Sequence, residues 1–375
     1  MKRVLEAFGE PILYGGQESF VFKTIKNMNK SRIDIDFLTP YFMNNPMYQK
    51  FAQSIKAKIY IFNLPFKVGG NRFNVISKYN RLLKKNKYDI VHIHSGSISI
   101  LAIFTLLAKI NGVNRIIVHS HTSGENENFK HELLKRFFSP VFSKMATVLL
   151  APSYDAAYWQ FPKKAFKKKG KLIKNGIEVD KYLFNCEKRK KIRNQLEFST
   201  NDTVLGNVGR LSSEKNQIFL IRLLKSLVVI NKKYKLLLVG DGPQYKILKK
   251  IVEKQNLSSN VKFVGNVNNV EDYLQAMDIF LFPSKYEGLG IASIEAQASG
   301  LPIIASTGVP KDINITGNVK FLSLGSPINE WIKVVRATDV NNRLNNIAKD
   351  RIVDKGYDIR TTAAELRRIY LENDK

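Results

Sequence analysis

Two acids frame a glycine-containing segment late in the chain, Glu287-Gly288-Leu289-Gly290-Ile291-Ala292-Ser293-Ile294-Glu295. The segment follows the apolar run Asp278–Phe282, and its glycines let backbone approach a ligand at the start of a helix. Glu295 falls about one and a half turns into that helix, where a carboxylate can accept from both hydroxyls of a ribose. Glu287 suits the hydroxyls of a sugar. Alternatively, Glu287 caps the helix and Glu295 is solvated, although its Ala, Ile and Ser neighbours make a poor setting for a surface acid.

Two cations occupy a comparable place earlier in the chain. The stretch Gly209-Arg210-Leu211-Ser212-Ser213-Glu214-Lys215 follows the apolar run Val204–Val208 and opens a helix, so Arg210 and Lys215 can point into a cleft from one loop. A diphosphate carries roughly two to three negative charges, and each charge-assisted contact contributes about 1.5–3 kcal/mol. The pair therefore suits a diphosphate. The alternative is two solvated cations, a common arrangement in a basic chain.

A third glycine-containing motif, Gly15-Gly16-Gln17-Glu18, lies between the first apolar run and a helix that extends to about Met28. Paired glycines permit close approach to an anion, and the helix start offers free N–H groups. The alternative is a flexible loop before a helix. The motif is not GxGxxG, so it does not indicate a dinucleotide site.

Four of the five histidines form two pairs, His92 with His94 and His119 with His121. The i, i+2 spacing puts each pair on one face of a strand, near the end of that strand. No nearby cysteine or paired carboxylates complete a metal set, so we predict no metal site. His92 and His119 suit packed, hydrogen-bonded positions, whereas His121, which precedes Thr122-Ser123-Gly124, is the candidate to meet a reacting sugar.

Parallel sheets must position these motifs, because continuous apolar runs alternate with helical patterns of about 10–16 residues. The runs that predict strands are Arg3–Ala7, Ile33–Leu38, Lys58–Phe62, Asp89–His94, Arg115–His119, Thr147–Leu150, Val204–Val208, Leu236–Val239, Val261–Val264, Asp278–Phe282 and Pro302–Ala305. A polar break at about residues 160–202 separates two sets. We therefore predict an α/β chain with two doubly wound, Rossmann-like domains facing across a cleft. Asp358–Glu372 predicts a final amphipathic helix.

Composition sets the broad class. The 375 residues predict about two domains, and 44% hydrophobic with 25% charged residues is ordinary globular usage. The lone Cys186 cannot pair within the chain. The apolar stretch Ile98–Ile110 is shorter than the about twenty residues of a membrane span, and Glu6 interrupts the apolar start. These features predict a cytosolic protein that can touch a membrane surface without crossing it.

The charge balance favours anionic partners, because 60 Lys and Arg against 32 Asp and Glu give a net charge of +28. Lysine is densest at residues 163–174, near the expected domain junction. This stretch is either a solvated surface or a contact for an anionic membrane surface, where each lysine contributes about 1 kcal/mol. No zinc-finger spacing or aromatic RNA-binding signature accompanies the charge, so we expect no nucleic acid partner.

Six motifs in order resemble the retaining nucleotide-sugar glycosyltransferases of family 4, across nearly the whole chain. They are Gly15-Gly16-x-Glu18, Asn175-Gly176-Ile177, Val208-Gly209-Arg210 with Lys215, Val239-Gly240-Asp241-Gly242-Pro243, Glu287 and Glu295. Within the family the chain looks most like bacterial capsule and exopolysaccharide enzymes of the EpsF type, an impression to which residues 116–123 and 318–325 add. One departure is Lys171-Leu172-Ile173-Lys174, where the family more often has an apolar strand ending in Pro.

The resemblance implies the GT-B fold, with an acceptor-side domain of residues 1–175 completed by a C-terminal helix at about 356–375. Residues 176–355 would bind the nucleotide-sugar, with a UDP-sugar as the expected co-substrate and no metal or other cofactor required. The implied binding residues are Arg210, Lys215, Gly288, Leu289 and Gly290 for the diphosphate, Glu295 for the ribose, Val264 and Gly265 for the base, and Gly15 and Gly16 closing from the first domain. The implied catalytic residues are His121 near the sugar and acceptor, Glu287 on the transferred sugar, and Arg210 and Lys215 at the leaving diphosphate.

The expected reaction moves a hexose or N-acetylhexosamine to an acceptor, with a lipid-linked oligosaccharide of cell-surface polysaccharide synthesis as the expected one. The site would be cytoplasmic, peripheral at the inner face of the membrane. Alternatives are a sugar-nucleotide epimerase of GT-B fold, a transferase with a protein acceptor, and a non-catalytic module that binds anionic surfaces or nucleic acid. The intact Arg210/Lys215 and Glu287/Glu295 pairs speak against the last.

Overall fold

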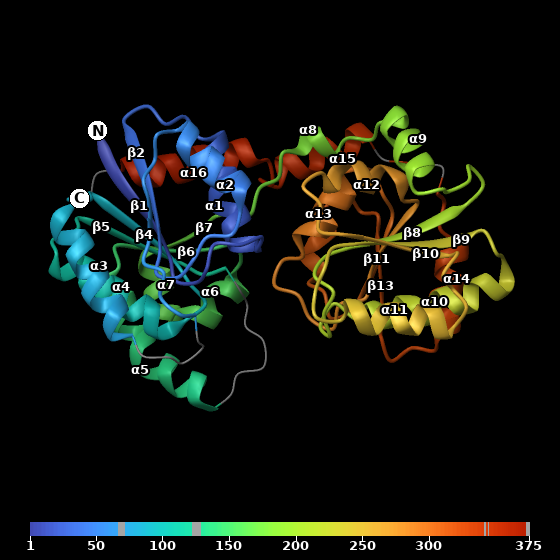
Figure 1. Ribbon diagram of the computed structural model, residues 1–375, viewed down its shortest axis with the longest axis horizontal. Helices are drawn as coiled ribbons and strands as arrows, with labels where there is room; N and C mark the ends of the chain where they lie inside the picture. The colour runs from blue at the N-terminus through green and yellow to red at the C-terminus, as the bar shows by residue number, and fades with distance from the viewer. Residues whose placement is uncertain (67–71, 122–128, 341–342, 344, 373–375) are drawn as a thin grey trace. The chain divides into compact units, whose positions relative to one another are not determined.

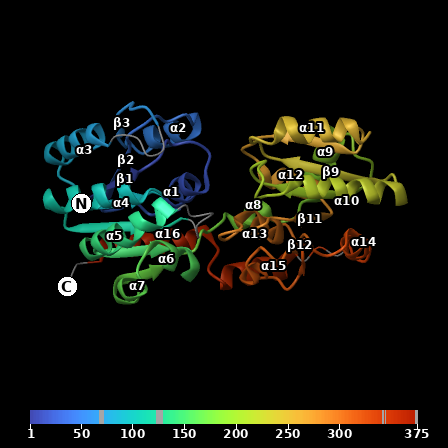
Figure 2. The same cartoon turned by 90° about the horizontal axis from the view of Figure 1, so that it is seen from below.

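The computed structural model describes residues 1–66, 72–121, 129–340, 343 and 345–372. The chain divides into two compact units, Met1–Gly176 with Ile359–Lys375, and Ile177–Asp358. Each unit is a parallel sheet with helices on both faces (Figures 1 and 2). The predicted α/β fold class with two doubly wound, Rossmann-like domains is therefore confirmed.

Unit 1 holds a seven-stranded sheet in the order β3-β2-β1-β4-β5-β6-β7. Its strands are β1 (Lys2–Phe8), β2 (Ile33–Thr39), β3 (Ile59–Ile61), β4 (Ile90–His94), β5 (Arg115–His119), β6 (Val148–Ala151) and β7 (Gly170–Leu172). Its helices are α1 (Gly16–Asn27), α2 (Pro46–Ser54), α3 (Phe73–Lys85), α4 (Ile98–Ile110), α5 (Phe129–Met145), α6 (Tyr154–Gln160), α7 (Lys163–Lys169) and α16 (Ile359–Leu371).

Alternate residues of the unit 1 strands enter two different cores, as the period of two requires. On β1, Val4 and Phe8 pack with α1, α2 and α16, whereas Leu5 and Ala7 pack with α3, α4 and α5. Glu6 therefore shares the face of Val4 and Phe8, where the last helix of the chain lies. The C-terminal helix supplies Leu366, Ile369 and Tyr370 to this core.

Unit 2 holds a six-stranded sheet in the order β10-β9-β8-β11-β12-β13. Its strands are β8 (Thr203–Val208), β9 (Tyr234–Val239), β10 (Val261–Gly265), β11 (Ile279–Phe282), β12 (Ile303–Ser306) and β13 (Val319–Leu322). Its helices are α8 (Val179–Tyr182), α9 (Cys186–Gln195), α10 (Gln217–Ile230), α11 (Tyr245–Lys254), α12 (Val270–Ala276), α13 (Ile291–Ala298), α14 (Ile328–Arg336) and α15 (Asn345–Asp354), with a 3-10 turn at Lys311–Ile313.

The lysine-dense stretch is folded rather than a linker. Residues 163–169 form α7 and Gly170–Leu172 forms the edge strand β7, which the sequence did not predict. Lys163, Lys164, Lys167 and Lys168 are exposed, while Phe166 is buried in the core. In the described ranges, no helix is long and apolar enough to cross a bilayer, and Ile98–Ile110 forms the 13-residue helix α4.

Candidate active site

The cation motif of unit 2, residues 209–215, follows the carboxyl end of β8, and the acid motif, residues 287–295, follows that of β11. These two strands are parallel neighbours in the sheet. The two loops are joined, since the Lys285 N–H donates to the Glu214 carbonyl at 2.8 Å. Lys215 Nζ lies 2.5 Å from Glu287 Oε1, and Ser284 Oγ donates to the same oxygen at 2.8 Å. The structure therefore brings Lys215 and Glu287 together as an ion pair that reaches solvent mainly through the lysine.

Arg210 is held by its backbone and leaves its guanidinium exposed. Its carbonyl accepts from Gln217 Nε2 at 3.0 Å, and the same amide group donates to Asn207 Oδ1 at 3.2 Å. Among the described residues, the Arg210 guanidinium has no hydrogen bond or ion pair with protein. Because its backbone is fixed and its guanidinium is exposed, Arg210 is available to an anionic ligand.

The N-terminus of α13 is open to a ligand. Gly290 is its N-cap with φ at 68°, and no side chain caps the helix. A side chain at Gly290 would place Cβ 2.7 Å from the Phe282 ring, so both backbone and packing favour glycine there. Glu287 therefore does not cap the helix, and that alternative is wrong. Gly288 and Leu289 precede the helix and are half-buried.

Glu295 is buried within α13, which excludes the alternative of a solvated helix acid. Tyr182 on α8 donates its hydroxyl to Glu295 Oε1 at 2.7 Å. Burial, followed by the negative charge of Glu295, raises the pKa of Tyr182 well above its usual range, so the phenol remains a donor. Sequence reasoning missed Tyr182, because it lies 113 positions before Glu295 on a four-residue helix.

Three strand ends meet in tight backbone turns beside this site. Gly265, which follows Val264 at the end of β10, has φ at 78° and accepts at its carbonyl from the Gly240 N–H at 2.9 Å. A Cβ on Gly240 would lie 2.1 Å from the Gly209 carbonyl oxygen. Val264 and Gly265 therefore lie at the same sheet edge as Arg210.

The paired glycines of unit 1 lie at the start of α1 and are exposed. Gly15 is the N-cap and Gly16 the first helical residue. A Cβ on Gly15 would approach Glu18 Oε2 to 2.4 Å, whereas a Cβ on Gly16 would meet nothing within 4 Å. Nothing in the described packing requires glycine at position 16, which leaves space there for a ligand.

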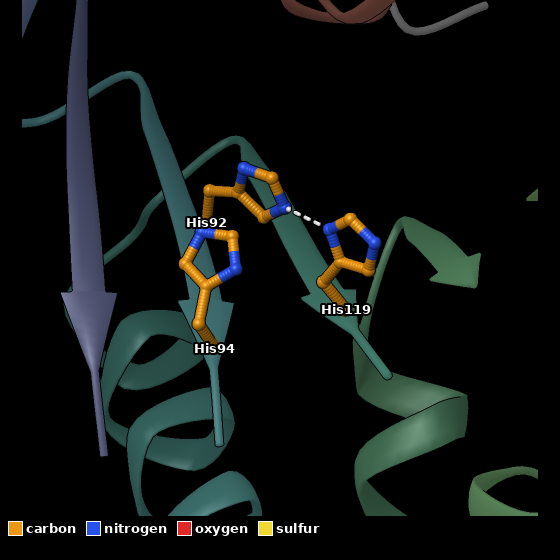
Figure 3. Close-up of side chains that lie close together, drawn as sticks. All are labelled: His92, His94 and His119. Atoms are coloured by element: carbon orange, nitrogen blue, oxygen red, sulfur yellow. Dashed lines mark hydrogen bonds between the residues drawn. The ribbon is translucent and has the colours of Figure 1, made fainter. Parts of the chain in front are cut away.

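The two histidine pairs form one network around Glu6, in which Glu6, His92, His94 and His119 are fully buried. Figure 3 shows the rings of His92, His94 and His119 close together at the ends of β4 and β5. His94 Nε2 lies 2.8 Å from Glu6 Oε2, and His94 Nδ1 lies 2.8 Å from His121 Nε2. His92 Nδ1 lies 3.2 Å from the same carboxylate oxygen, and its Nε2 lies 3.3 Å from His119 Nδ1. The predicted hydrogen-bonded packing of His92 and His119 is confirmed.

Tyr370 of α16 completes the network. Its hydroxyl donates to Glu6 Oε1 and lies 2.7 Å from His92 Nδ1. Burial alone would raise the pKa of Glu6, but the charge and hydrogen bonds of His92 and His94 outweigh burial and hold that pKa well below its usual range. A buried carboxylate with these donors is ionised.

Burial also lowers the pKa of three of the rings. It lowers the pKa of His94 to about 4, aided by His92 and opposed by Glu6. The pKa values of His119 and His121 are well below their usual range, first because of burial and then because of neighbouring histidines. These three rings are therefore neutral near pH 7. Glu6 was visible in the sequence as an acid inside an apolar run.

His92, His94 and His119 are also near enough to be weighed as a metal set, since each offers a nitrogen within 4.8 Å of the others. A zinc ion needs about 2.0–2.1 Å to each nitrogen. The nitrogens of His92 and His94 instead contact Glu6, Tyr370, His119 and His121. We assign the cluster as a hydrogen-bonded network that ends at His121, just beyond β5. Thr122-Ser123-Gly124 lies outside the described residues.

Family models match both halves of the chain. A Glycosyltransferase Family 4 model matches residues 14–181, and a model of the glycosyl transferases group 1 matches residues 188–352. The EpsF protein of Bacillus subtilis is 28% identical over 363 residues, which covers 95% of this chain and 93% of EpsF.

A second relative has a specific name, the Escherichia coli UDP-Gal:alpha-D-GlcNAc-diphosphoundecaprenol alpha-1,3-galactosyltransferase. It is 30% identical over 317 residues, with 80% of this chain and 79% of the relative covered. Among solved structures, HepE of Anabaena in complex with UDP-glucose superposes with a TM-score of 0.77 at 18% identity, covering 98% of this chain and 99% of HepE. The two sheets, the ordered motifs and these matches together show that the chain belongs to the family 4 glycosyltransferases of GT-B fold.

Proposed function

We propose that this glycosyltransferase moves a hexose or N-acetylhexosamine from a UDP-sugar to a lipid-linked oligosaccharide in the synthesis of a cell-surface polysaccharide. One observation carries the donor half of the proposal. Unit 2 gathers Arg210, the Lys215–Glu287 pair and the uncapped start of α13 at one sheet edge, with Glu295 in the same helix. The Escherichia coli relative, whose name includes a UDP-sugar and a diphosphoundecaprenol acceptor, supports the substrate classes.

The residues take separate roles on the donor. Arg210 and Lys215 hold the diphosphate together with the N–H groups of Gly288, Leu289 and Gly290. Glu295 accepts from the ribose hydroxyls, and Tyr182 keeps its carboxylate oriented. Glu287 accepts from hydroxyls of the transferred sugar, and its contact with Lys215 couples the sugar and diphosphate subsites. The base lies by Val264 and Gly265. In unit 1, Gly15 and Gly16 close on the phosphate.

The proposed reaction exchanges one bond at the anomeric carbon for another. The bond to the diphosphate oxygen breaks, a bond to the acceptor oxygen forms on the same face, and the leaving diphosphate takes the acceptor proton. Negative charge grows on the diphosphate as the bond breaks, so fixed donors at Arg210, Lys215 and α13 stabilise the transition state more than the ground state. His121 lies by the sugar and acceptor. Retention is tested by the anomeric configuration of the product in NMR spectra.

We also propose that these cations and N–H groups act without a divalent metal. Turnover by enzyme treated with a chelator and dialysed should then equal that of untreated enzyme. Loss of turnover that Mg²⁺ or Mn²⁺ restores would contradict this part of the proposal. The site of action proposed is cytoplasmic, peripheral at the inner face of the membrane, where a lipid-linked acceptor lies.

Donor binding tests the proposal directly. A thermal-shift panel of nucleotide-sugars should show the largest stabilisation with a UDP-sugar, because ligand bound only to the folded state raises its stability. In calorimetry, Arg210→Ala, Lys215→Ala and Glu295→Ala should each weaken donor affinity about tenfold or more. Lys249→Ala, an exposed cation on α11, is the matched control. Unchanged affinity in all three site variants, or conversion of a UDP-sugar in the absence of acceptor, would contradict the assignment.

A further inference from the structure

Helix α5 carries a second apolar face that is exposed to solvent. Its inner side is accounted for, because Phe142 is buried against the ring of Phe161 and Ser139 Oγ donates to the Gln160 carbonyl at 2.6 Å. On the outer side, five large apolar residues are exposed, with Phe137 the most exposed at 64%. We call this set the α5 stripe: Leu133, Leu134, Phe137, Phe138 and Val141.

The α5 stripe is continuous along the helix. At 100° per residue its five side chains fall within an arc of about 140°, which is the width of an amphipathic face. Phe142 and Ser139 fall outside that arc, on the side that faces the core. Single exposed apolar residues are ordinary, but a contiguous set on one helix face marks an interaction site.

Helix α5 and its neighbours are rich in positive charge. Helix α5 lies beside α7 (Figure 2). Lys169 Nζ of α7 donates to the Lys144 carbonyl at the end of α5 at 2.9 Å. The other four lysines of α7 are exposed. Helices α5, α6 and α7 together contain nine Lys and Arg against two acids, Glu132 and Asp155.

The positive charge of the chain is concentrated in unit 1, which contains these helices. Unit 1 contains 33 Lys and Arg against 13 Asp and Glu, a net charge of +20, whereas unit 2 contains 27 against 19, a net charge of +8. A second copy of so basic a surface would be repelled, so an apolar contact between copies is disfavoured. The partner that fits must be apolar in its interior and anionic at its surface.

We propose that the α5 stripe and the lysines of α7 dock unit 1 onto an anionic phospholipid bilayer. The stripe inserts at the boundary of headgroups and acyl chains, as amphipathic helices do to a depth of about 5–10 Å, and the lysines contact the headgroups. The proposal rests on the proposed function, since a lipid-linked acceptor lies at such a surface. Its tests use vesicles without donor or acceptor, so the two can fail separately.

Two kinds of interaction predict two kinds of salt response. Contacts between lysines and headgroups weaken as the Debye length falls from about 10 Å at 0.1 M salt to about 3 Å at 1 M. Insertion of apolar side chains does not weaken with salt. The initial binding to vesicles should therefore require anionic lipid, and part of the vesicle binding should persist at high salt.

The experiment measures sedimentation of the full chain with vesicles of phosphatidylglycerol and phosphatidylcholine, and with vesicles of phosphatidylcholine alone. Phe137→Ser with Phe138→Ser should weaken binding to the anionic vesicles about tenfold or more, and abolish the part that resists salt. Val229→Ser with Ile230→Ser is the matched control, because Val229 on α10 of unit 2 is 85% exposed and Ile230 is exposed too. All four sites are exposed, so these variants should fold.

A site-specific probe locates the inserted surface. In a Cys186→Ser background, Phe137→Cys and Val229→Cys each provide one thiol for an environment-sensitive dye, since the chain has a single cysteine. Only the dye at position 137 should shift to shorter wavelength with anionic vesicles. Equal shifts at both positions, or vesicle binding unchanged by the Phe137/Phe138 substitutions, would overturn the proposal. So would a dimer in light scattering without lipid that these substitutions dissociate, because the stripe would then cover a second copy.

Discussion

One buried carboxylate, Glu6, determines which nitrogen of His121 carries a proton. His94 is neutral near pH 7 and faces the ionised Glu6 with Nε2 at 2.8 Å, so its proton lies on Nε2 and its Nδ1 is an acceptor. His121 Nε2, 2.8 Å from that acceptor, must then be the donor. The lone pair of His121 is left on Nδ1, a buried atom that has no hydrogen-bond partner among the described residues. In the proposed role beside the sugar, His121 would therefore act as a hydrogen-bond acceptor once a substrate reaches this atom.

Replacement of His94 tests this assignment of the protonated ring nitrogens. His94→Asn and His94→Leu both remove the contact with Glu6, but an asparagine oxygen can still accept from His121 Nε2. In spectra of ¹⁵N-labelled histidine, the wild type and His94→Asn should show His121 protonated on Nε2, and His94→Leu should lose that preference. Turnover should fall about fivefold from His94→Asn to His94→Leu, the effect of one hydrogen bond. A wild-type His121 protonated on Nδ1 would refute the assignment.

Tyr182 is expected to act on the donor through Glu295. Tyr182→Phe removes the hydroxyl that lies 2.7 Å from Glu295 Oε1 while keeping the ring in the core. Affinity for a UDP-sugar should fall about threefold to tenfold, less than in Glu295→Ala, because the variant loses one hydrogen bond and keeps the carboxylate. Tyr234→Phe, at the start of β9, is the control. Calorimetry that gives equal affinities for wild type and Tyr182→Phe would count against the orienting role.

Some partners of the site residues cannot be predicted from the sequence. Arg210, Lys215, Glu287 and Glu295 are identifiable because each belongs to a motif that directly follows an apolar run. Tyr182 and Tyr370 have no such signal, since they reach Glu295 and Glu6 from 113 and 364 positions away. Only the folded sheets bring such residues together.

At the scale of elements, the start of α1 and the turn after β9 make opposite demands on glycine. Gly16→Ala meets no atom within 4 Å and introduces a better helix former, so the stability should stay the same or rise by about 0.5–1 kcal/mol. If Gly16 closes on the diphosphate, kcat/KM should nevertheless fall. Gly240→Ala, with φ at 130° and a Cβ 2.1 Å from the Gly209 carbonyl oxygen, should destabilise unit 2 strongly. Urea unfolding and donor kinetics measure the two effects. Unchanged kcat/KM in Gly16→Ala would remove that residue from the phosphate site.

The strands that sequence reasoning missed are both edge strands. β7 and β13 lie at the ends of their sheets, and each contains a lysine, Lys171 in β7 and Lys320 in β13. A central strand is covered on both sides and needs a continuous apolar run, whereas an edge strand tolerates charge and is often short. Apolar runs therefore predict the centre of each sheet better than its border. The exposure of the α5 stripe could not be predicted from the sequence either. Helix α5 has apolar residues on two faces, and the sequence does not show which of these faces packs in the core.

The two units of the whole molecule should respond differently to acid, since all five histidines lie in unit 1 and unit 2 contains none. The pKa of His94 is about 4 in the folded state, below its ordinary value of 6.5. Between these values the unfolded chain binds a proton that the folded chain does not, so stability falls as pH falls. The slope from His94 is about 1.4 kcal/mol per pH unit. His119 and His121 act in the same direction, whereas the raised pKa values of the acids Glu10 and Glu18 oppose them.

Comparison of slopes isolates the contribution of His94. Hydrogen exchange of β4 and β5 peptides between pH 6.5 and 5, corrected for intrinsic rates, should show unit 1 stability falling less steeply in His94→Asn than in wild type. The mean difference over this range is about 1 kcal/mol per pH unit, because the unfolded histidine is only half protonated at pH 6.5. Glu10 and Glu18 are present in both proteins and are not among the groups that His94 shifts, so their effects cancel in the difference. Loss of His94 also removes one cause of the low pKa values of His119 and His121, and this change makes the slope of the variant shallower still. Peptides of β8 and β11 are the internal control and should show the same pH dependence in both proteins. Equal slopes in unit 1 would mean that His94 titrates alike in the folded and unfolded states, and the buried network could not then fix the proton on His121.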